Sequence, residues 1–281
     1  MAGMDKSRIG AMNLIYQHHS LDHMLDSFDR IGVRCFELWA PCEHFDLRMP
    51  SLASTAAFRR KLDSRGFSLT CVTPEQCGYP HNIASSNRDV RRYAVEHFKK
   101  YIDAAAQLGA DKMLCGAGWG NVDEDLDEAW KRSVESLHEM VDHARQAGIK
   151  LAFEILNHYE TNLVYNLETM KRMAQEITDP AFQFCVDTVP VELDGKKLSD
   201  FFDALGERII HIHMTDGDPM GHVPPGLGQH DMQGYFRTLE GYGYSGYVTI
   251  EICDTAWSND PEKATRIGYE NLCKALDEAH Q

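Results

Sequence analysis

The sequence predicts an α/β protein, a (β/α)8 TIM barrel built as a single domain over residues 1–281. Hydrophobic runs alternate with amphipathic stretches eight times along the chain, and several runs are continuously apolar, as expected for parallel strands covered on both faces. The length of 281 residues is ordinary for one such barrel, whose usual size is about 250 residues. No linker or low-complexity segment interrupts the sequence, so one domain accounts for all the units.

The expected strands are short apolar runs that recur at regular intervals. They lie near residues 8–14, 33–39, 67–73, 111–116, 150–156, 182–187, 208–214 and 247–253. Between them, apolar side chains at helical spacing predict amphipathic helices, because residues three and four apart share one face. Two of these faces are well defined, one by Val90, Ala94, Phe98, Ile102, Ala105 and Leu108 and the other by Leu126, Trp130, Val134, Leu137, Val141 and Ala144.

Glycines mark the expected ends of the helices. Six of them stand a few residues before an expected strand, where a left-handed residue would end the preceding helix: Gly32, Gly66, Gly109, Gly148, Gly206 and Gly243. Asp179-Pro180 has the same place after the fifth helix. A doubly wound sheet is the alternative fold, but it would leave eight strands open, and no glycine-rich phosphate loop follows the first strand. The closed barrel is therefore the predicted architecture.

Composition and charge exclude several classes of function. The net charge of −15, without a strong Lys/Arg cluster, disfavours nucleic acid as a partner, because a phosphodiester binder needs a basic face. No segment approaches the roughly 18–20 consecutive apolar residues of a membrane helix, and the N-terminus lacks the apolar run of a secretory signal. Eight scattered cysteines are expected to be buried reduced thiols. We therefore expect a cytoplasmic enzyme that contacts neither nucleic acid nor membrane.

Polar residues stand at the C-terminal ends of the last four expected strands: Glu154, Asp187, His213 and Glu251. In a parallel barrel these ends converge on one point, where the fold places its active sites. Any one of these carboxylates could simply cap the following helix, but capping does not explain four matching positions. Three carboxylates and one imidazole suit Mn²⁺, Mg²⁺ or Co²⁺ better than a structural zinc, which favours thiolates and imidazoles. The sequence therefore predicts one divalent metal ion, with Mn²⁺ as the first choice.

These residues and the segments around them resemble the xylose-isomerase-like superfamily of sugar isomerases and epimerases over nearly the whole chain. Within it, the chain is most similar to the ketose 3-epimerases and to their fructoselysine 3-epimerase subfamily. The similarity lies in TPEQCGYPHN (73–82), HYETNLVYN (158–166), CVDTVPV (185–191), HIHMTDGD (211–218) and HVPPGLG (222–228). It implies an enzyme that inverts C3 of a small-molecule ketose or fructosamine with the help of a bound metal. It also implies a homo-oligomer.

Inversion at C3 needs two bases on opposite sides of the substrate. Glu154 and Glu251, on strands five and eight, are the natural pair, and one would abstract a proton while the other donates one. The family pattern adds Glu160, six residues after the first ligand, as a substrate-binding carboxylate, with a role at a helix N-terminus as the alternative. His211, two residues before a ligand, should face the barrel interior as a core histidine or as a partner of a metal ligand.

Three further residues are candidate substrate contacts, each with an ordinary structural alternative. His222 precedes a Pro-Pro-Gly loop after strand seven and would touch the substrate unless it is a surface loop residue. Trp119, in the GAGWG loop after strand four, would stack on a sugar face unless it packs within the protein. Asp216, with Asp218, adds negative charge at the rim, which would favour an amine-bearing substrate over a sugar phosphate.

Two departures from the ketose-epimerase pattern bear on the substrate. Pro190 stands where free-ketose epimerases usually place a His, and Asp218-Pro219 stands where they have an Arg, so a free hexulose is less expected than a fructosamine. An aldose–ketose isomerase remains an alternative, as does a C-glycoside deglycosidase-type lyase, which would need a small β-rich partner subunit. An endonuclease IV-like hydrolase is disfavoured, because the strand-four loop contains no His and the charge is acidic.

Overall fold

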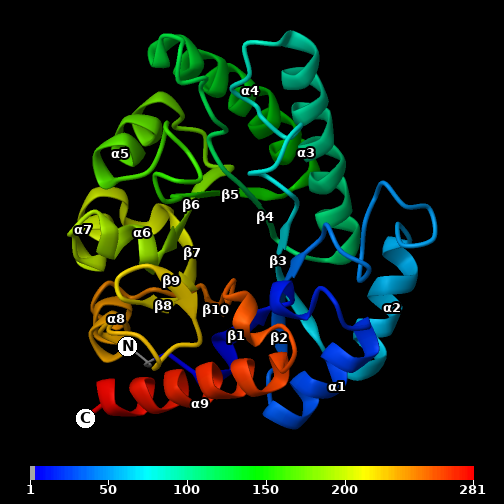
Figure 1. Ribbon diagram of the computed structural model, residues 1–281, viewed down its shortest axis with the longest axis vertical. Coiled ribbons are helices and arrows are strands. Elements are labelled where there is room, and N and C mark those ends of the chain that lie inside the picture. The colour runs from blue at the N-terminus through cyan, green and yellow to red at the C-terminus, as the bar shows by residue number, and fades with distance from the viewer. Residues whose placement is uncertain (1–3) are drawn as a thin grey trace.

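Eight parallel strands form a closed barrel in the computed structural model, which describes residues 4–281 (Figure 1). The strands are β1 (Ile9–Met12), β2 (Cys35–Trp39), β3 (Ser68–Thr73), β4 (Lys112–Cys115), β5 (Lys150–Glu154), β6 (Phe182–Asp187), β7 (Ile209–Met214) and β10 (Tyr247–Ile250). Each lies within one of the predicted runs, so the predicted fold class is confirmed. Residues 1–3 of the predicted domain lie outside the described residues.

The order of strands around the barrel is β1-β10-β7-β6-β5-β4-β3-β2, and the pairing of β1 with β10 closes it. Because all eight run parallel, their C-terminal ends share one end of the barrel. The register there sets Asp187 of β6 opposite His213 of β7. A short antiparallel hairpin that periodicity did not predict follows β7 and consists of β8 (Asp216–Gly217) and β9 (Gly221–Val223).

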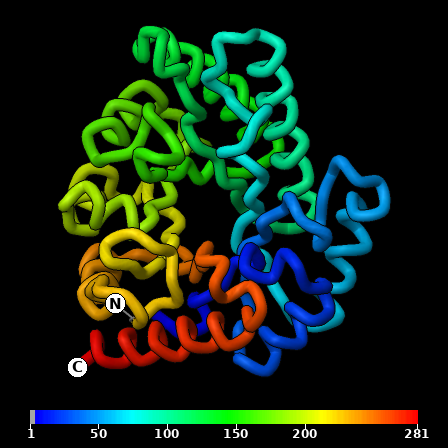
Figure 2. Tube along the Cα trace, in the orientation of Figure 1, coloured from blue at the N-terminus to red at the C-terminus, as the bar shows by residue number. Residues whose placement is uncertain are grey.

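Helices surround the barrel on its outer side (Figures 1 and 2). They are α1 (Leu21–Ile31), α2 (Thr55–Arg65), α3 (Arg88–Leu108), α4 (Leu126–Ala147), α5 (Leu167–Glu176), α6 (Thr188–Leu193), α7 (Leu198–Leu205), α8 (Met232–Gly241) and α9 (Pro261–Ala279). Short 3-10 helices span Lys6–Arg8, Leu14–Tyr16, Gly206–Arg208 and Thr255–Trp257. The last helix, α9, packs against α1, α8 and β1, so it covers the seam where the barrel closes.

Serines cap the N-terminal ends of two helices, and the glycines at the C-terminal ends follow the prediction with two differences. Ser20 and Ser54 cap α1 and α2, because each side-chain oxygen accepts a backbone N–H of the first turn. Four of the six predicted glycines are left-handed C-caps: Gly32, Gly66, Gly109 and Gly148. Gly206 ends α7 with a ψ of −133°, outside the left-handed helical region, and Gly243 lies one residue beyond the cap of α8.

The predicted apolar faces of α3 and α4 pack toward the barrel. On α3 every predicted position except the half-buried Val90 is buried. On α4, Leu126 is 44% exposed because it is the first residue of the helix, and Val134 is half-buried. The other four predicted positions are buried: Trp130, Leu137, Val141 and Ala144. Together with the strand residues they form one continuous apolar layer between the barrel and its helices.

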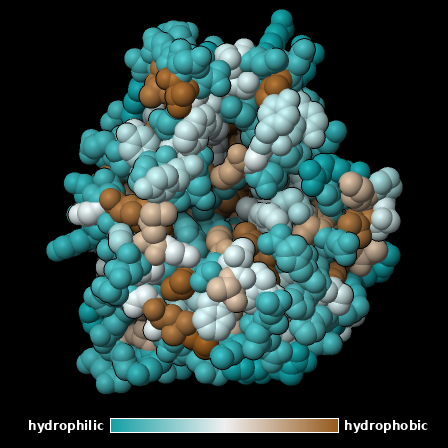
Figure 3. All heavy atoms as spheres, viewed as in Figure 1, coloured by the Kyte–Doolittle hydropathy of each residue, from teal (hydrophilic) through white to brown (hydrophobic). Residues whose placement is uncertain are grey.

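The surface agrees with the acidic, polar composition. Figure 3 shows that the face seen in Figure 1 is mainly hydrophilic and is hollowed near its centre. Among residues 4–281, no helix combines the length and the apolar character that crossing a bilayer requires. All eight cysteines are free, as predicted, but only four of them are buried: Cys35, Cys71, Cys115 and Cys185. Cys42, Cys253 and Cys273 are half-buried and Cys77 is exposed, so the predicted burial holds for half of them.

Candidate metal centre

The four predicted ligands meet at the C-terminal end of the barrel. Glu154 ends β5, Asp187 ends β6, His213 is the penultimate residue of β7, and Glu251 directly follows β10. These four strands are consecutive neighbours around the barrel, in the order β5, β6, β7 and β10. Oxygens of the three carboxylates lie within 4.8 Å of one another. The Nδ1 atom of His213 lies 2.6 Å from Glu154 Oε1 and 3.2 Å from Glu251 Oε2.

The arrangement fits a divalent cation. His213 is fully buried, and its Nδ1 atom makes no well-aligned hydrogen bond within residues 4–281 although it faces two carboxylates. A buried polar atom without a partner is costly, and a bound cation would take up its lone pair. Three oxygen ligands and one nitrogen match the preferences of Mn²⁺, Mg²⁺ and Co²⁺. Asp187 also caps α6 by accepting the N–H of Val189. The helix-capping role considered for these carboxylates therefore applies to Asp187, which lies in the cluster as well.

The charges of the site shift the pKa values of its members. Burial raises the pKa of Glu154 to about 7, and the carboxylates of Glu251 and Asp187 add to the rise while His213 opposes it. Burial would also raise the pKa of Asp187, but His222 holds it below its usual range. Three acidic groups packed this closely repel one another, and a cation between them would remove that repulsion.

His222 joins the site from the hairpin after β7. Its Nε2 atom lies 2.8 Å from Asp187 Oδ2 and 3.7 Å from Glu251 Oε2. Burial lowers the pKa of His222, but the charges of Asp187 and Glu251 outweigh this and raise it to about 10. Its backbone is left-handed, with a φ of 46°, a conformation that non-glycine residues seldom adopt outside special positions. His222 therefore lies in the centre and is not a surface loop residue.

Glu160 and Trp119 lie together beside the centre. Both line a pocket of about 170 Å³ between the loops that follow β3, β4 and β5. Glu160 is exposed at its mouth and accepts hydrogen bonds from Asn157. Gln76 also lines this pocket, and its Nε2 atom donates to Glu154 Oε2 at 2.8 Å, which connects the pocket to the centre.

Asp216 does not have the rim position that we expected. Its side chain is 1% exposed, and its two oxygens accept four backbone N–H groups. The donors are Gly217 at 2.8 Å, Gly226 at 2.7 Å, Gly228 at 2.9 Å and His230 at 3.0 Å. A carboxylate satisfied in this way holds the loop after the hairpin in place and offers no free oxygen to a substrate amine. Asp218 is exposed, as expected.

Two residues behind the ligands, Glu37 and Thr215, were not predicted from the sequence. Glu37, at the centre of β2, is fully buried, and its Oε2 atom lies 2.6 Å from His211 Nε2 and 3.0 Å from His213 Nε2. The hydroxyl of Thr215 donates to Asp187 Oδ1 at 2.9 Å. The signal that could have revealed Glu37 is an acidic residue inside an apolar strand, CFELW, whereas the predicted ligands stand at the ends of their strands.

The fold is a closed (β/α)8 barrel that carries a cluster of candidate metal ligands at the ends of its last four strands. A family model described as "Xylose isomerase-like TIM barrel" matches residues 25–275, and the chain belongs to this family.

Two relatives of known sequence and one solved structure sharpen this placement. The chain is 26% identical over 275 residues to a fructoselysine 3-epimerase of Shigella flexneri, and this match covers 96% of this chain and 99% of the relative. It is 24% identical over 177 residues to a ketose 3-epimerase of Arthrobacter globiformis, and this match covers 60% of this chain and 59% of the relative. A structure of L-ribulose 3-epimerase shares the fold, with a TM-score of 0.83, 18% identity and coverage of 97% of this chain and 95% of that one. These relatives support an enzyme of the isomerase class.

Proposed function

We propose that this protein is a metal-dependent epimerase that inverts C3 of a ketose or fructosamine. The observation that carries the proposal is the meeting of two glutamates at the Nδ1 atom of His213, with Glu154 at 2.6 Å and Glu251 at 3.2 Å. They come from the end of β5 and from the position just after β10, and these two strands lie on either side of β7 in the barrel. Likeness along nearly the full length to a fructoselysine 3-epimerase supports the same reaction class.

The ligands of the cation would be Glu154, Asp187, Glu251 and the Nδ1 atom of His213. Mn²⁺ is the first candidate, with Mg²⁺ and Co²⁺ as alternatives, because the set is rich in oxygen. When bound, such a cation supplies Lewis acidity that makes the proton beside a sugar carbonyl easier to remove.

The two glutamates would share the proton transfers. The C3 hydrogen of a 2-ketose lies next to the carbonyl, so a glutamate on one face can take it while the electron pair moves into an enediolate of the sugar. The second glutamate then gives a proton to the opposite face of C3, which inverts the centre. Burial raises the pKa of Glu154, whereas a bound cation would lower it, so the two effects oppose each other in setting how readily this group exchanges a proton.

The pocket beside the centre favours a particular substrate class. We assign substrate contacts to Glu160, Trp119 and His222, which border the centre or line its neighbouring pocket. No lysine or arginine is among the residues lining that pocket within the described chain, so it lacks a clamp for a phosphate. An acidic, aromatic lining suits a neutral sugar that bears an amine-linked extension, which is the chemistry of a fructosamine.

Proton NMR of sugars incubated with the Mn²⁺-loaded protein in D₂O tests the reaction, with the metal removed by chelation before spectra are recorded. Fructoselysine, psicose, tagatose and fructose are tested separately. Deuterium at C3 with growth of a new epimer is the expected result, with fructoselysine the best substrate. Exchange at C1 would instead indicate an aldose–ketose isomerase. No exchange, with the metal bound, would contradict the proposal and direct attention to lyase chemistry with a missing partner subunit.

A further inference from the structure

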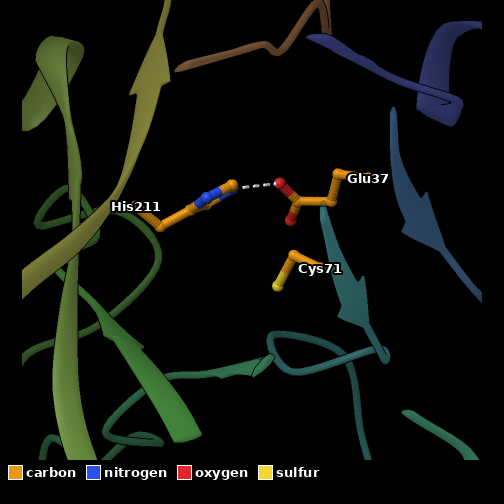
Figure 4. Close-up of side chains that lie close together, drawn as sticks. All are labelled: Glu37, Cys71 and His211. Atoms are coloured by element: carbon orange, nitrogen blue, oxygen red, sulfur yellow. Dashed lines mark hydrogen bonds and ion pairs between the residues drawn. The ribbon is translucent and has the colours of Figure 1, made fainter. Parts of the chain in front are cut away.

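Glu37 spans the interior of the barrel and reaches a candidate metal ligand from the opposite wall. It lies on β2, which has β1 and β3 as neighbours, whereas His211 and His213 lie on β7, between β6 and β10. Its Oε2 atom accepts from both imidazoles, and its Oε1 atom accepts from the hydroxyl of Thr73. Figure 4 shows the carboxylate of Glu37 directed at His211, with Cys71 below the pair. All five of these side chains are buried.

We propose that Glu37 is a positioning residue that sets the tautomer and the orientation of His213 for metal binding. The inference rests on the proposed metal site and is independent of which sugar reaction the site performs. A neutral imidazole carries one proton, either on Nδ1 or on Nε2. Because Glu37 can only accept from the Nε2 atom of His213, the proton resides on Nε2 and the Nδ1 lone pair is left facing Glu154 and Glu251.

The second imidazole holds Glu37 in place. His211 Nε2 lies 2.6 Å from the same carboxylate oxygen, and the hydroxyl of Thr249 lies 3.2 Å from His211 Nε2. Thr73 fixes the other oxygen, so the carboxylate has donors on both sides and cannot rotate away from His213 without losing them. A ligand imidazole that donates its second N–H to a carboxylate is both oriented and made more basic, which increases its affinity for a cation.

Binding of Mn²⁺ measured by calorimetry is the first test. Partners of this kind typically contribute about 10–100-fold to metal affinity, so Glu37→Ala should weaken Mn²⁺ binding by that factor. Glu37→Gln should lose less, because its amide oxygen can still accept the Nε2–H. Cys71→Ala is the matched control, since Cys71 is equally buried beside Glu37 but makes no hydrogen bond to His213. Glu37→Ala that binds Mn²⁺ within twofold of the wild type would overturn the proposal.

Proton NMR of the Co²⁺-loaded protein is the second test. Its main observation is made on the wild type, so it does not depend on a variant that might fail to fold. The wild type should show one hyperfine-shifted imidazole N–H that is present in H₂O and disappears only slowly after transfer to D₂O, because Glu37 holds it away from solvent. This signal should move or disappear in Glu37→Gln and stay in Cys71→Ala. A wild-type spectrum without a protected N–H would refute the assigned tautomer.

The two tests separate this inference from the proposed function. Wild-type protein that binds no divalent cation would contradict the metal site itself. Wild-type protein that binds one, with a Glu37→Ala variant of equal affinity, would contradict only the role of Glu37. A second Co²⁺ whose near-ultraviolet thiolate band vanishes in Cys71→Ala would place Glu37, Cys71 and His211 in a metal site of their own and overturn the positioning role.

Discussion

At the scale of single residues, the centre is a set of acidic groups that are stable together only with compensating positive charge. Glu154 and Asp187 are 3% exposed, so water cannot screen their repulsion. Without a bound cation, protonated His213 and His222 would supply part of the compensation through contacts of 2.6–3.2 Å and 2.8 Å with these carboxylates and Glu251. The same residues would then serve as cation ligands and as acid/bases, and a substitution at one glutamate should affect both roles.

Glu154→Gln and Glu251→Gln are each expected to abolish turnover. Loss of a general acid or base costs about 10²–10⁴-fold in rate, and loss of a ligand carboxylate weakens metal binding in addition. Initial rates of C3 deuterium exchange measure the effect, with bound metal determined in the same samples. Glu168→Gln, an exposed residue on α5, is the control. A glutamine variant that keeps more than a few per cent of the wild-type rate would contradict the two-base assignment.

A second prediction at this scale concerns acid stability and His97 on α3. Its side chain is 7% exposed, and burial lowers its pKa to about 3, helped by the neighbouring His81 and Arg48 and opposed by Asp46. Above pH 6.5 His97 is neutral in both the folded and the unfolded states, so it does not change the free energy of unfolding. Below pH 6.5 only the unfolded state gains the proton, and the free energy of unfolding should fall by about 2 kcal/mol at pH 5.

His97→Phe removes this titration and keeps an aromatic ring in the cluster with His81 and Tyr101. Urea unfolding at pH 7 and pH 5, in EDTA so that metal release does not contribute, should show a smaller loss of stability in the variant than in the wild type. His138→Gln, an exposed position on α4, should behave like the wild type. If His97→Phe loses as much stability between pH 7 and pH 5 as the wild type does, His97 is protonated in the folded protein.

At the scale of elements, the loop after the β8–β9 hairpin depends on one buried carboxylate. Asp216→Ala would leave four backbone N–H groups without their acceptor, which should cost about 1–3 kcal/mol or more. Gly228 permits this packing, because a Cβ there would lie 2.2 Å from Asp216 Oδ1. Hydrogen exchange should rise in residues 217–230 of the variant. Asp218→Ala, at an exposed site of the same hairpin, should leave exchange unchanged.

The elements also show what sequence can and cannot predict. Glu154 and Asp187 were predictable because each ends a long apolar run, and strands of five and six residues give a readable pattern. The hairpin was not, because strands of two and three residues, β8 and β9, are too short to create periodicity. The burial of Asp216 was missed because its partners are backbone N–H groups, which any residue supplies. Glu37 was missed because its contact with His213 crosses the barrel and exists only once the barrel is closed.

At the scale of the whole molecule, cation binding should stabilise the fold, because the four ligands come from four strands and the unfolded chain cannot gather them. Free Mn²⁺ at 100 times its Kd would add about 2.7 kcal/mol to the free energy of unfolding. Thermal unfolding should therefore shift upward with Mn²⁺ and return on addition of EDTA. Asp187→Asn should reduce the shift, whereas a shift of equal size in that variant would place the cation elsewhere.

The pairing of β1 with β10 has a consequence for the time at which the protein becomes active in the cell. Synthesis proceeds from β1 onward, so β1 leaves the ribosome long before the strand that completes its sheet. Glu251 directly follows β10, and a nascent chain arrested before it would hold three of the four ligands beside an unpaired sheet edge. The fourth ligand is therefore synthesised together with the strand that closes the barrel, so the centre can be complete only once the barrel is able to close.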